Sequence, residues 1–363
     1  MDPVYKCYAE NFFPLDEVMQ IFYIKNMIIA FVLNTKNFPW KRDDEGETTD
    51  TAEKAKRKFT MLAPVQMHFG PSYRKETRAQ LRFFPERHIE KDAVRVLVDM
   101  TVVLDIDLTD YQHSVLVKGG ETFPVLRTAS KLSEDPQTFA KSWLFIQIAM
   151  EIIDYVLVNN FGCKDYFWVF SGNKGVHCII TDKKICSCAQ KGNVALHNFI
   201  TCNQAAQAIF YPGQHEALCR NVYNQSLTLQ FCYKVIKDHM DKILEDQCMY
   251  STASKEILGI ECPKVRRWAW YTQKAEMRAI VFALKVAMVR LDANMLKDKH
   301  LFKSPFSVNI NTGFVAVPMH PGFDPASAPN IADLARDPDL FRKKMERPLA
   351  LIRDIAAKKS AGI

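Results

Sequence analysis

The chain has 363 residues, of which 48% are hydrophobic and 25% are charged, a composition typical of globular domains and not of disordered or fibrous chains. Its formal charge of +7 suits a partner that carries phosphates, such as a nucleic acid. The most apolar run, Met27–Leu33, is too short to cross a bilayer, so we expect an intracellular protein with no membrane partner.

The N-terminal third is expected to change from helices to strands. Residues 1–35 alternate apolar and polar positions at helical spacing and predict one or two helices. Residues 41–58 are dominated by charge and threonine and predict a mobile surface loop. Strands are expected from Thr60 onward, and the β-branched run in residues 94–108 predicts two strands or one bent strand.

The middle of the chain carries a helix and a hairpin. Residues 139–159 repeat apolar side chains every three or four positions, as in a packed helix. Residues 167–170 and 176–180 are short apolar runs separated by a glycine-bearing loop, which predicts two paired strands. Residues 186–261 lack strong alternation and predict a helical subdomain inserted between strands.

Beyond this region we expect a helix over residues 273–288. A second hairpin is predicted from residues 306–308 and 314–317, with Asn and Gly supplying the positive-φ positions between them. The expected fold class is mixed α/β (α+β), with mixed sheets flanked by helices. The expected parts are a core of residues 1–185 and 262–330, the inserted subdomain of residues 186–261, and a helical tail of residues 331–363.

Two aspartates, Asp105 and Asp107, lie inside the apolar run V-V-L-D-I-D-L. Side chains of a strand alternate between its faces, so the two carboxylates share one face. Like charges repel there unless a cation lies between them, and a hard divalent ion is the usual partner of carboxylate oxygens. The alternative is a strand end at which both carboxylates are hydrated. The pattern alone leaves both interpretations open.

The segment S-G-N-K-G-V-H, from Ser171 to His177, has the composition of an anion-binding loop. Glycines such as Gly172 let backbone N–H groups approach a ligand, and the side chains of Ser171, Lys174 and His177 add donors. A hairpin with a surface lysine has the same pattern. The segment is therefore ambiguous when it is taken alone.

Other candidate residues are also ambiguous singly. Lys303 is either a phosphate contact or part of a turn, and Asp292 is either a metal ligand or a solvated helix-end residue. Four possible zinc ligands occur within a short stretch: Cys186, Cys188, His197 and Cys202. Their C-x-C spacing is unusual for a zinc site, and buried cysteine commonly acts as a small hydrophobic residue.

Several motifs follow one another in a fixed order. D-I-D-x-T-D-Y begins at Asp105, W-V-x-S-G-x-x-G-V-H-C at Trp168, R-L-D at Arg290, K-S-P-F-S-V at Lys303 and T-G at Thr312. In this order they resemble the small catalytic subunit of archaeal and eukaryotic DNA primases. Several coinciding motifs are more specific than any one of them. The K-S-P-F-S-V motif resembles the eukaryotic branch more than the archaeal one.

The resemblance implies roles for individual residues. The carboxylates Asp105, Asp107 and Asp292 would bind two catalytic divalent ions. The triphosphate of the incoming nucleotide would be held by Ser171, Gly172, Lys174, His177, Arg290 and Lys303. Two metals can activate a 3′ hydroxyl and stabilise the leaving pyrophosphate, and oxygen-only ligands favour magnesium or manganese.

The chain also departs from the family pattern. Family members carry a zinc site between the D-x-D strand and the nucleotide loop, but residues 108–162 contain no cysteine, so this site is missing unless the Cys186 group replaces it. Asn173 stands where eukaryotic members have part of a basic pair, Asn309 where a histidine is usual, and His68 where an acidic residue is usual. These changes concern nucleotide affinity more than metal binding.

We therefore expect a DNA primase that starts short RNA chains from ribonucleoside triphosphates on a single-stranded DNA template, in the nucleus. Its expected partners are a primase large subunit and a replicative DNA polymerase. One alternative is a primase-polymerase that prefers deoxynucleotides. Another is a non-catalytic subunit that binds template or serves assembly, although such a module has no use for three metal-binding carboxylates. Candidate template contacts are Arg82, Arg87, Arg266 and Arg267.

Overall fold

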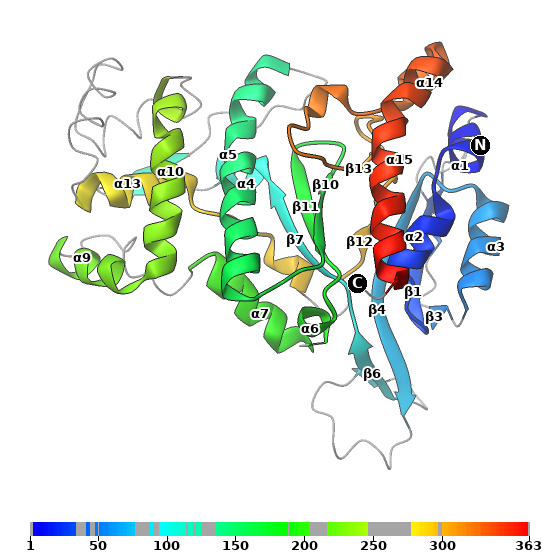
Figure 1. Cartoon of the computed structure of the whole chain (residues 1–363), viewed down its shortest axis with the longest axis horizontal. Helices are drawn as coiled ribbons and strands as arrows, with labels where there is room; N and C mark the ends of the chain where they lie inside the picture. Colours follow the sequence, from blue (N-terminus) through cyan, green and yellow to red (C-terminus); the bar gives the residue numbers. More distant parts are fainter. Residues whose placement is uncertain are drawn as a thin grey trace.

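Two antiparallel sheets lie side by side in this computed structural model, with helices packed against them (Figure 1). The structure describes residues 3–33, 41–43, 48–49, 51–76, 88–89, 94–113, 115–118, 121–124, 136–187, 189–202, 216–245, 277–296 and 300–361. The mixed α/β class is confirmed. We expected mixed sheets, but every described strand pairing is antiparallel.

The first sheet has the strand order β2-β1-β4-β6-β5, with β3 paired to β1 and β12 paired to β4. Its strands are β1 (Met27–Leu33), β2 (Lys41–Asp43), β3 (Thr48–Thr49), β4 (Gln66–Glu76), β5 (His88–Ile89), β6 (Val94–Asp99) and β12 (Phe302–Lys303). The pairing of Lys303 with His68 brings the K-S-P motif to the centre of a sheet built from the N-terminal part of the chain.

The second sheet has the order β13-β10-β11-β7. Its strands are β7 (Val102–Asp107), β10 (Tyr166–Phe170), β11 (Gly175–Ile180) and β13 (Val317–Pro318), and a separate pair is formed by β8 (Val115–Lys118) and β9 (Glu121–Pro124). The expected hairpin of β10 and β11 is confirmed. The run of residues 94–108 forms two strands as expected, and these belong to different sheets.

The helices cover the sheets. They are α1 (Pro3–Asn11), α2 (Leu15–Phe22), α3 (Ala52–Leu62), α4 (Leu108–His113), α5 (Pro136–Tyr155), α6 (Lys183–Cys186), α7 (Ala189–Ile200), α9 (Glu216–Gln225), α10 (Leu227–Glu245), α13 (Met277–Ala287), α14 (Ile331–Arg336) and α15 (Pro338–Ala361). Shorter turns are η2 (Val156–Asn160), η3 (Ala293–Leu296) and η4 (Pro325–Ser327). The expected central helix and helical tail are confirmed as α5, α14 and α15.

Helix α5 packs on the apolar face of the second sheet. The ring of Trp143 lies 5.9 Å from Phe170 of β10, and Phe145 lies 5.2 Å from Tyr111 of α4. The segment Phe139–Asn160 is long and apolar enough to cross a membrane by length and composition, and 61% of its most apolar window is buried inside the protein. The segment is therefore apolar because it is a helix of the protein core.

The one or two helices expected in residues 1–35 are present as α1 and α2, but two other N-terminal expectations were wrong. Met27–Leu33 is a strand, because its apolar side chains are buried between the neighbouring strands and the helices that cover them. Residues 41–58 are not a structureless loop: they contain β2, β3 and the start of α3. Although α3 is highly charged, Ala55 and Phe59 are buried and the Thr51 side chain accepts the Lys54 N–H at its N-terminus.

The second hairpin forms around the turn of residues 309–313, with one isolated bridge between Val308 and Val315. Gly313, with φ of 75°, is the only residue of this turn with positive φ. The expectation that asparagine would also adopt positive φ here was wrong. Helix α13 begins at Met277, and residues 273–276 of the predicted helix lie outside the described residues.

Helices α9, α10 and α13 gather on one side of α5 (Figure 1), and α10 packs against both α5 and α13. The helical character expected for residues 186–261 is therefore present in the described portions of that range. The domain boundaries themselves remain a prediction.

Candidate active site

The carboxylates of β7 face the same way as His177 of β11. Antiparallel register places His177 opposite Asp105 and Gly175 opposite Asp107, so these residues share one face of the sheet. Leu104 and Ile106 point to the other face and are buried. The alternation expected from the V-V-L-D-I-D-L run is thus present, and both aspartate side chains remain partly accessible.

Asp292 lies beside this strand. Its backbone N–H donates to the carbonyl of Asp105 at 3.2 Å, so the R-L-D motif lies against the edge of β7. The structure therefore brings all three predicted metal ligands into one neighbourhood, although Asp292 is remote in sequence from the other two.

Electrostatics link the three carboxylates. Burial, followed by the negative charges of Asp107, Asp292 and Asp110, raises the pKa of Asp105 to about 7, while Lys303 acts in the opposite direction. A divalent cation would relieve this repulsion, so the donor set fits an oxygen-binding metal. No group of three His, Cys, Asp or Glu side chains among the described residues is already converged at metal-binding distance.

In Asp107 and in Asp292, hydrogen bonds within a local turn hold one carboxylate oxygen in place. Oδ1 of Asp107 accepts the N–H and hydroxyl of Thr109 at 2.7 and 2.8 Å. Oδ1 of Asp292 accepts the backbone and side-chain N–H of Asn294, both at 2.8 Å. These orienting residues were not predicted, but the D-x-T and D-x-N spacings are typical of turns in which an aspartate accepts a hydrogen bond from the residue two positions later.

The loop between β10 and β11 has backbone N–H groups without an acceptor among the described residues. Its ends are closed by the Ser171 N–H to the Gly175 carbonyl at 3.0 Å and by the Gly175 N–H to Ser171 Oγ at 3.3 Å. The N–H groups of Gly172, Asn173 and Lys174 donate to no acceptor in the described part of the chain. Successive unpaired N–H groups around a positive-φ glycine form a concavity that attracts anions.

The two glycines of the loop are required for different reasons. Gly172 has φ of 80°, which favours glycine. A Cβ on Gly175 would lie 2.1 Å from the carbonyl oxygen of Ile106, so only glycine lets β11 approach β7 this closely. The loop and the acidic strand are therefore held directly against each other.

Lys303 and His177 complete the described part of the site. The Lys303 ammonium donates to the carbonyl of Ser171, and burial lowers its pKa to about 8. Burial, with smaller effects of Lys303 and His68, lowers the pKa of His177 to about 3, so its imidazole is neutral at pH 7. The buried Nδ1 of His177 and Oδ1 of Asn173 have no partner among the described residues, which fits a site that receives a polar ligand.

Arg290 begins the R-L-D segment that carries Asp292. Its guanidinium stacks 5.2 Å from the Tyr111 ring centre and donates to the Lys285 carbonyl at 2.9 Å. These contacts attach the R-L-D segment to α4 through Tyr111 and to α13 through Lys285. The role of Arg290 in nucleotide binding remains a prediction.

His68 lies opposite Lys303 in the pairing of β4 with β12. Its Nε2 lies 3.0 Å from Oε1 of Gln66, whose amide donates to the Val308 carbonyl at 2.6 Å. The position that departs from the family pattern is thus close to Lys303 and His177, because His68 contributes to the lowered pKa of His177. The Asn309 N–H donates to the Phe314 carbonyl at 2.8 Å, and Oδ1 of Asn309 accepts the Asn311 N–H at 3.0 Å.

The weak zinc candidates do not form a cluster in the described residues. Cys186 donates to the Ile180 carbonyl at 3.2 Å, His197 Nε2 lies 3.4 Å from the Leu291 carbonyl, and Cys202 is hydrogen-bonded to Cys232. Cys188 lies outside the described residues. The described cysteines are free thiols, and most are buried as the composition predicts.

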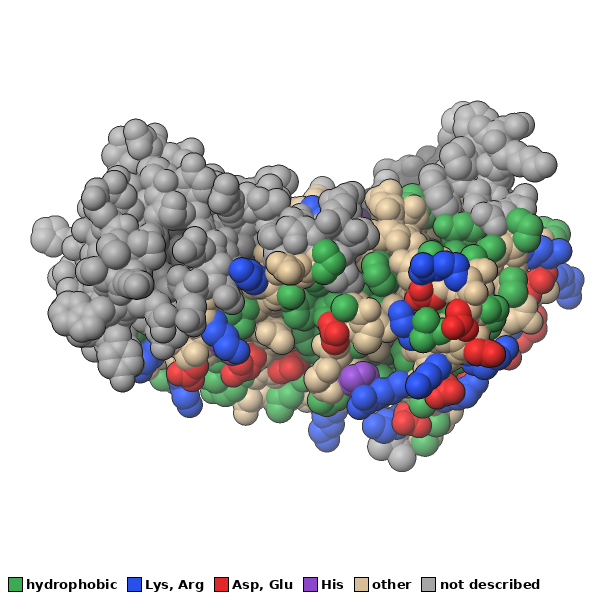
Figure 2. All heavy atoms as spheres, turned by 90° about the horizontal axis from the view of Figure 1, so that it is seen from above, with side chains coloured by type: hydrophobic (Ala, Val, Ile, Leu, Met, Phe, Trp, Pro, Cys, Tyr) green, Lys and Arg blue, Asp and Glu red, His purple; other side chains and the backbone are tan. Residues whose placement is uncertain are grey.

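No continuous basic stripe is visible on the described part of the face in Figure 2, where Lys and Arg side chains alternate with Asp and Glu. The four arginines proposed as template contacts, Arg82, Arg87, Arg266 and Arg267, lie outside the described residues. The template surface is therefore not assigned to particular residues.

Carboxylates gathered beside a loop of unpaired N–H groups are the arrangement expected at the site of a nucleotidyltransferase. The model of the DNA primase small subunit family matches residues 104–321, a range that includes every predicted site residue. The chain belongs to the DNA primase small subunit family, whose members are nucleotidyltransferases that use divalent metal.

Individual relatives agree with this family. The chain is 22% identical to the DNA primase small subunit of Drosophila melanogaster, over 82% of this chain and 73% of the relative. It is 28% identical to that of Caenorhabditis elegans, over 68% and 66%, and 25% identical to that of Saccharomyces cerevisiae, over 75% and 69%. The chain thus spans about two thirds to three quarters of these relatives, all of eukaryotic type.

Proposed function

We propose that this chain is the catalytic subunit of a DNA primase and that Asp105, Asp107 and Asp292 form its reaction centre. The observation that carries the proposal is the backbone hydrogen bond from Asp292 to Asp105, which adds a third carboxylate to the pair on β7. Divalent ions held there, magnesium or manganese, would neutralise triphosphate charge and lower the pKa of the attacking 3′ hydroxyl.

The protein groups around the carboxylates bind and orient the nucleotide in this proposal. The N–H groups of residues 172–174 would bind phosphate oxygens, with the side chains of Ser171, Lys174 and Lys303 adding donors. Neutral His177 would donate one hydrogen bond without adding a positive charge. Arg290, which begins the R-L-D segment, would contribute to nucleotide binding.

The proposed substrates are ribonucleoside triphosphates and a single-stranded DNA template, and the product is a short RNA primer. A primase large subunit and a replicative DNA polymerase are the proposed partners, and the nucleus is the proposed location. These assignments are supported by the eukaryotic family to which the chain belongs.

The test is primer-independent dinucleotide formation on single-stranded DNA with Mg²⁺ or Mn²⁺, using the chain together with its large subunit. Asp105→Asn should abolish synthesis, because it removes one carboxylate charge from the centre. The matched control is Asp339→Asn, since Asp339 is 91% exposed on α15. Unchanged synthesis by Asp105→Asn would contradict the proposal.

The same assay distinguishes the other activities. Preferential incorporation of deoxynucleotides without a primer would identify a primase-polymerase. Template binding without any synthesis by the wild-type complex would identify a non-catalytic subunit.

A further inference from the structure

The turn of residues 309–313 contacts the nucleotide loop of residues 171–175. The Thr312 hydroxyl donates to the carbonyl of Gly172 at 2.5 Å. A Cβ on Gly172 would lie 2.9 Å from the Phe314 carbonyl oxygen and 3.0 Å from Asn309 Cβ, so the turn lies directly against the loop. The contact falls on the loop residue with positive φ, where the backbone is least restrained by sequence.

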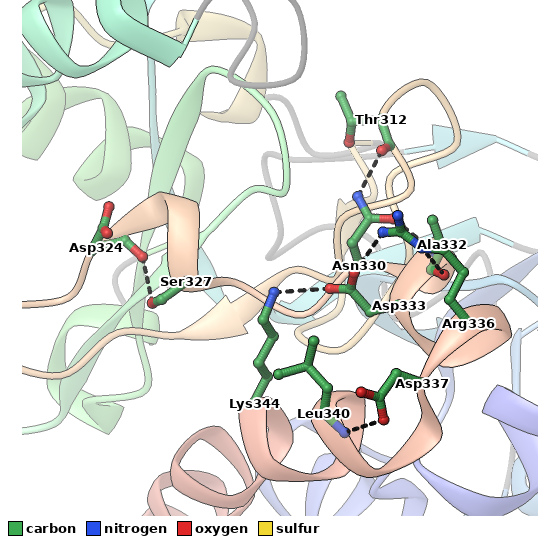
Figure 3. A network of polar contacts seen from close by, with 10 residues as sticks. All are labelled: Thr312, Asp324, Ser327, Asn330, Ala332, Asp333, Arg336, Asp337, Leu340 and Lys344. Carbon is green, nitrogen blue, oxygen red and sulfur yellow. Dashed lines mark hydrogen bonds and ion pairs between the residues drawn. The ribbon is translucent and has the colours of Figure 1, made fainter.

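Asn330 supports this turn from its other side (Figure 3). Its Nδ2 donates to the Thr312 carbonyl at 3.0 Å, while its Oδ1 accepts the Ala332 N–H at 2.9 Å as the N-cap of α14. The neighbouring Ile331 N–H donates to the Gly313 carbonyl at 2.9 Å. One side chain thus joins the start of a helix to the residue that bonds the nucleotide loop.

The helix that carries Asn330 is itself anchored. Asp333 on α14 is buried and pairs with Lys344 of α15 at 2.9 Å and with Arg336 at 3.0 Å. Figure 3 shows Asp333 close to Asn330, with Lys344 and Arg336 reaching toward it. The path from α15 through α14 to Gly172 therefore consists of packed elements and direct hydrogen bonds.

We propose that Asn330 is a positioning residue for the nucleotide loop, acting through Thr312. The proposal rests on the proposed function, since it takes residues 171–175 as the phosphate-binding loop. Asn330 lies beyond the residues 104–321 matched by the family model and does not touch the carboxylate group. Holding Gly172 in place keeps the unpaired N–H groups directed at the phosphates, which reduces the entropy lost on binding.

Two variants separate loop positioning from helix capping. Asn330→Asp and Asn330→Ser keep an oxygen that can cap α14 but lack the amide donor to Thr312. Both should melt close to wild type and raise KM for the nucleoside triphosphate about tenfold, with kcat little changed. Asn330→Ser controls for the charge that aspartate adds.

Thr312 provides the matched pair. Thr312→Val removes the donor to Gly172 and should raise KM similarly, whereas Thr312→Ser retains the hydroxyl and should restore the wild-type value. Combining Asn330→Ser with Thr312→Val should change KM little more than either variant alone, because both act on one path.

Hydrogen exchange tests positioning without nucleotide. The Ser171 and Gly175 amides, which are bonded across the loop, should exchange faster in Asn330→Ser and Thr312→Val than in wild type. Unchanged exchange together with unchanged KM in Asn330→Ser would overturn the proposal and leave Asn330 as a helix cap only. Failure of the proposed function would appear differently, as absence of synthesis by the wild-type complex, and the exchange result would still decide whether Asn330 positions the loop.

Discussion

Nε2 of His177 lies 3.6 Å from Oδ1 of Asp105, across the pairing of β11 with β7. The two groups have pKa values displaced in opposite directions, to about 3 for His177 and about 7 for Asp105. The neutral forms of both are therefore favoured by folding when no cation is bound.

These displacements predict opposite pH effects of two variants in a chelating buffer. As pH falls from 7 to 4, native Asp105 takes up a proton before the unfolded carboxyl does, which stabilises the fold. Below about 6.5 the unfolded imidazole takes up a proton that native His177 refuses until about pH 3, which destabilises the fold. Relative to wild type, Asp105→Asn should lose unfolding free energy on acidification, and His177→Gln should gain it.

Urea denaturation between pH 4 and pH 8 measures both effects, each bounded by about 1.4 kcal/mol per pH unit for one proton. Comparison with wild type removes the contribution of carboxyl groups elsewhere in the chain. Parallel profiles for the two variants would show that the two groups are not displaced in opposite directions.

Metal should stabilise the native chain. An ion that binds only the folded state at a hundred times its Kd adds about 2.7 kcal/mol, so Mn²⁺ should raise the thermal midpoint of wild type. A triple variant with Asn in place of Asp105, Asp107 and Asp292 should show no such rise, whereas Asp339→Asn should retain it. An undiminished rise in the triple variant would place the ion elsewhere.

Lys303 should contribute to triphosphate affinity. Its ammonium donates to the Ser171 carbonyl and is thereby held at the proposed nucleotide loop. Lys303→Met should therefore weaken ATP binding about tenfold, equivalent to about 1.4 kcal/mol. Binding of adenosine should change much less, because it carries no phosphate. The control is Lys343→Met on the exposed side of α15, and equal losses for ATP and adenosine would argue against a phosphate contact.

Gly175 should be the least replaceable glycine of the site. Gly175→Ala would place a methyl group 2.1 Å from the Ile106 carbonyl, so it should reduce the unfolding free energy by about 2 kcal/mol or more. Gly162→Ala is the comparison, since nothing lies within 4 Å of its added Cβ and only its φ of 60° is unfavourable, at about 1 kcal/mol. Chemical denaturation measures the unfolding free energy of both variants. A larger loss in Gly162→Ala than in Gly175→Ala would contradict this order.

The alternation of side chains along a strand and the order of the motifs predicted the central residues of the proposed site. Alternation in β7 placed Asp105 and Asp107 on one face, and motif order added Asp292 before any contact was known. Met27–Leu33 was misassigned because helical spacing nearby was extended into a run whose burial requires a strand. Helix α3 was missed because so few of its side chains are buried.

Tertiary contacts explain what sequence patterns could not provide. The bonds from Asn330 to Thr312 and from Thr312 to Gly172 join segments that are far apart along the chain. Neither end has a local pattern that identifies its partner. A helix N-cap such as Asn330 predicts only the start of α14.

The pairing of β12 with β4 has a consequence for the order of folding. The Tyr8 hydroxyl donates to the Phe306 carbonyl at 2.6 Å, and the Gln66 amide donates to Val308, so buried polar groups near the N-terminus find their partners only near residue 306. A nascent chain must therefore keep its first sheet incomplete until residues 302–308 have been synthesised. Synthesis interrupted before this segment would leave both the N-terminal sheet and the edge that carries Lys303 unfinished, so the proposed reaction centre would assemble only after residue 308 has been added.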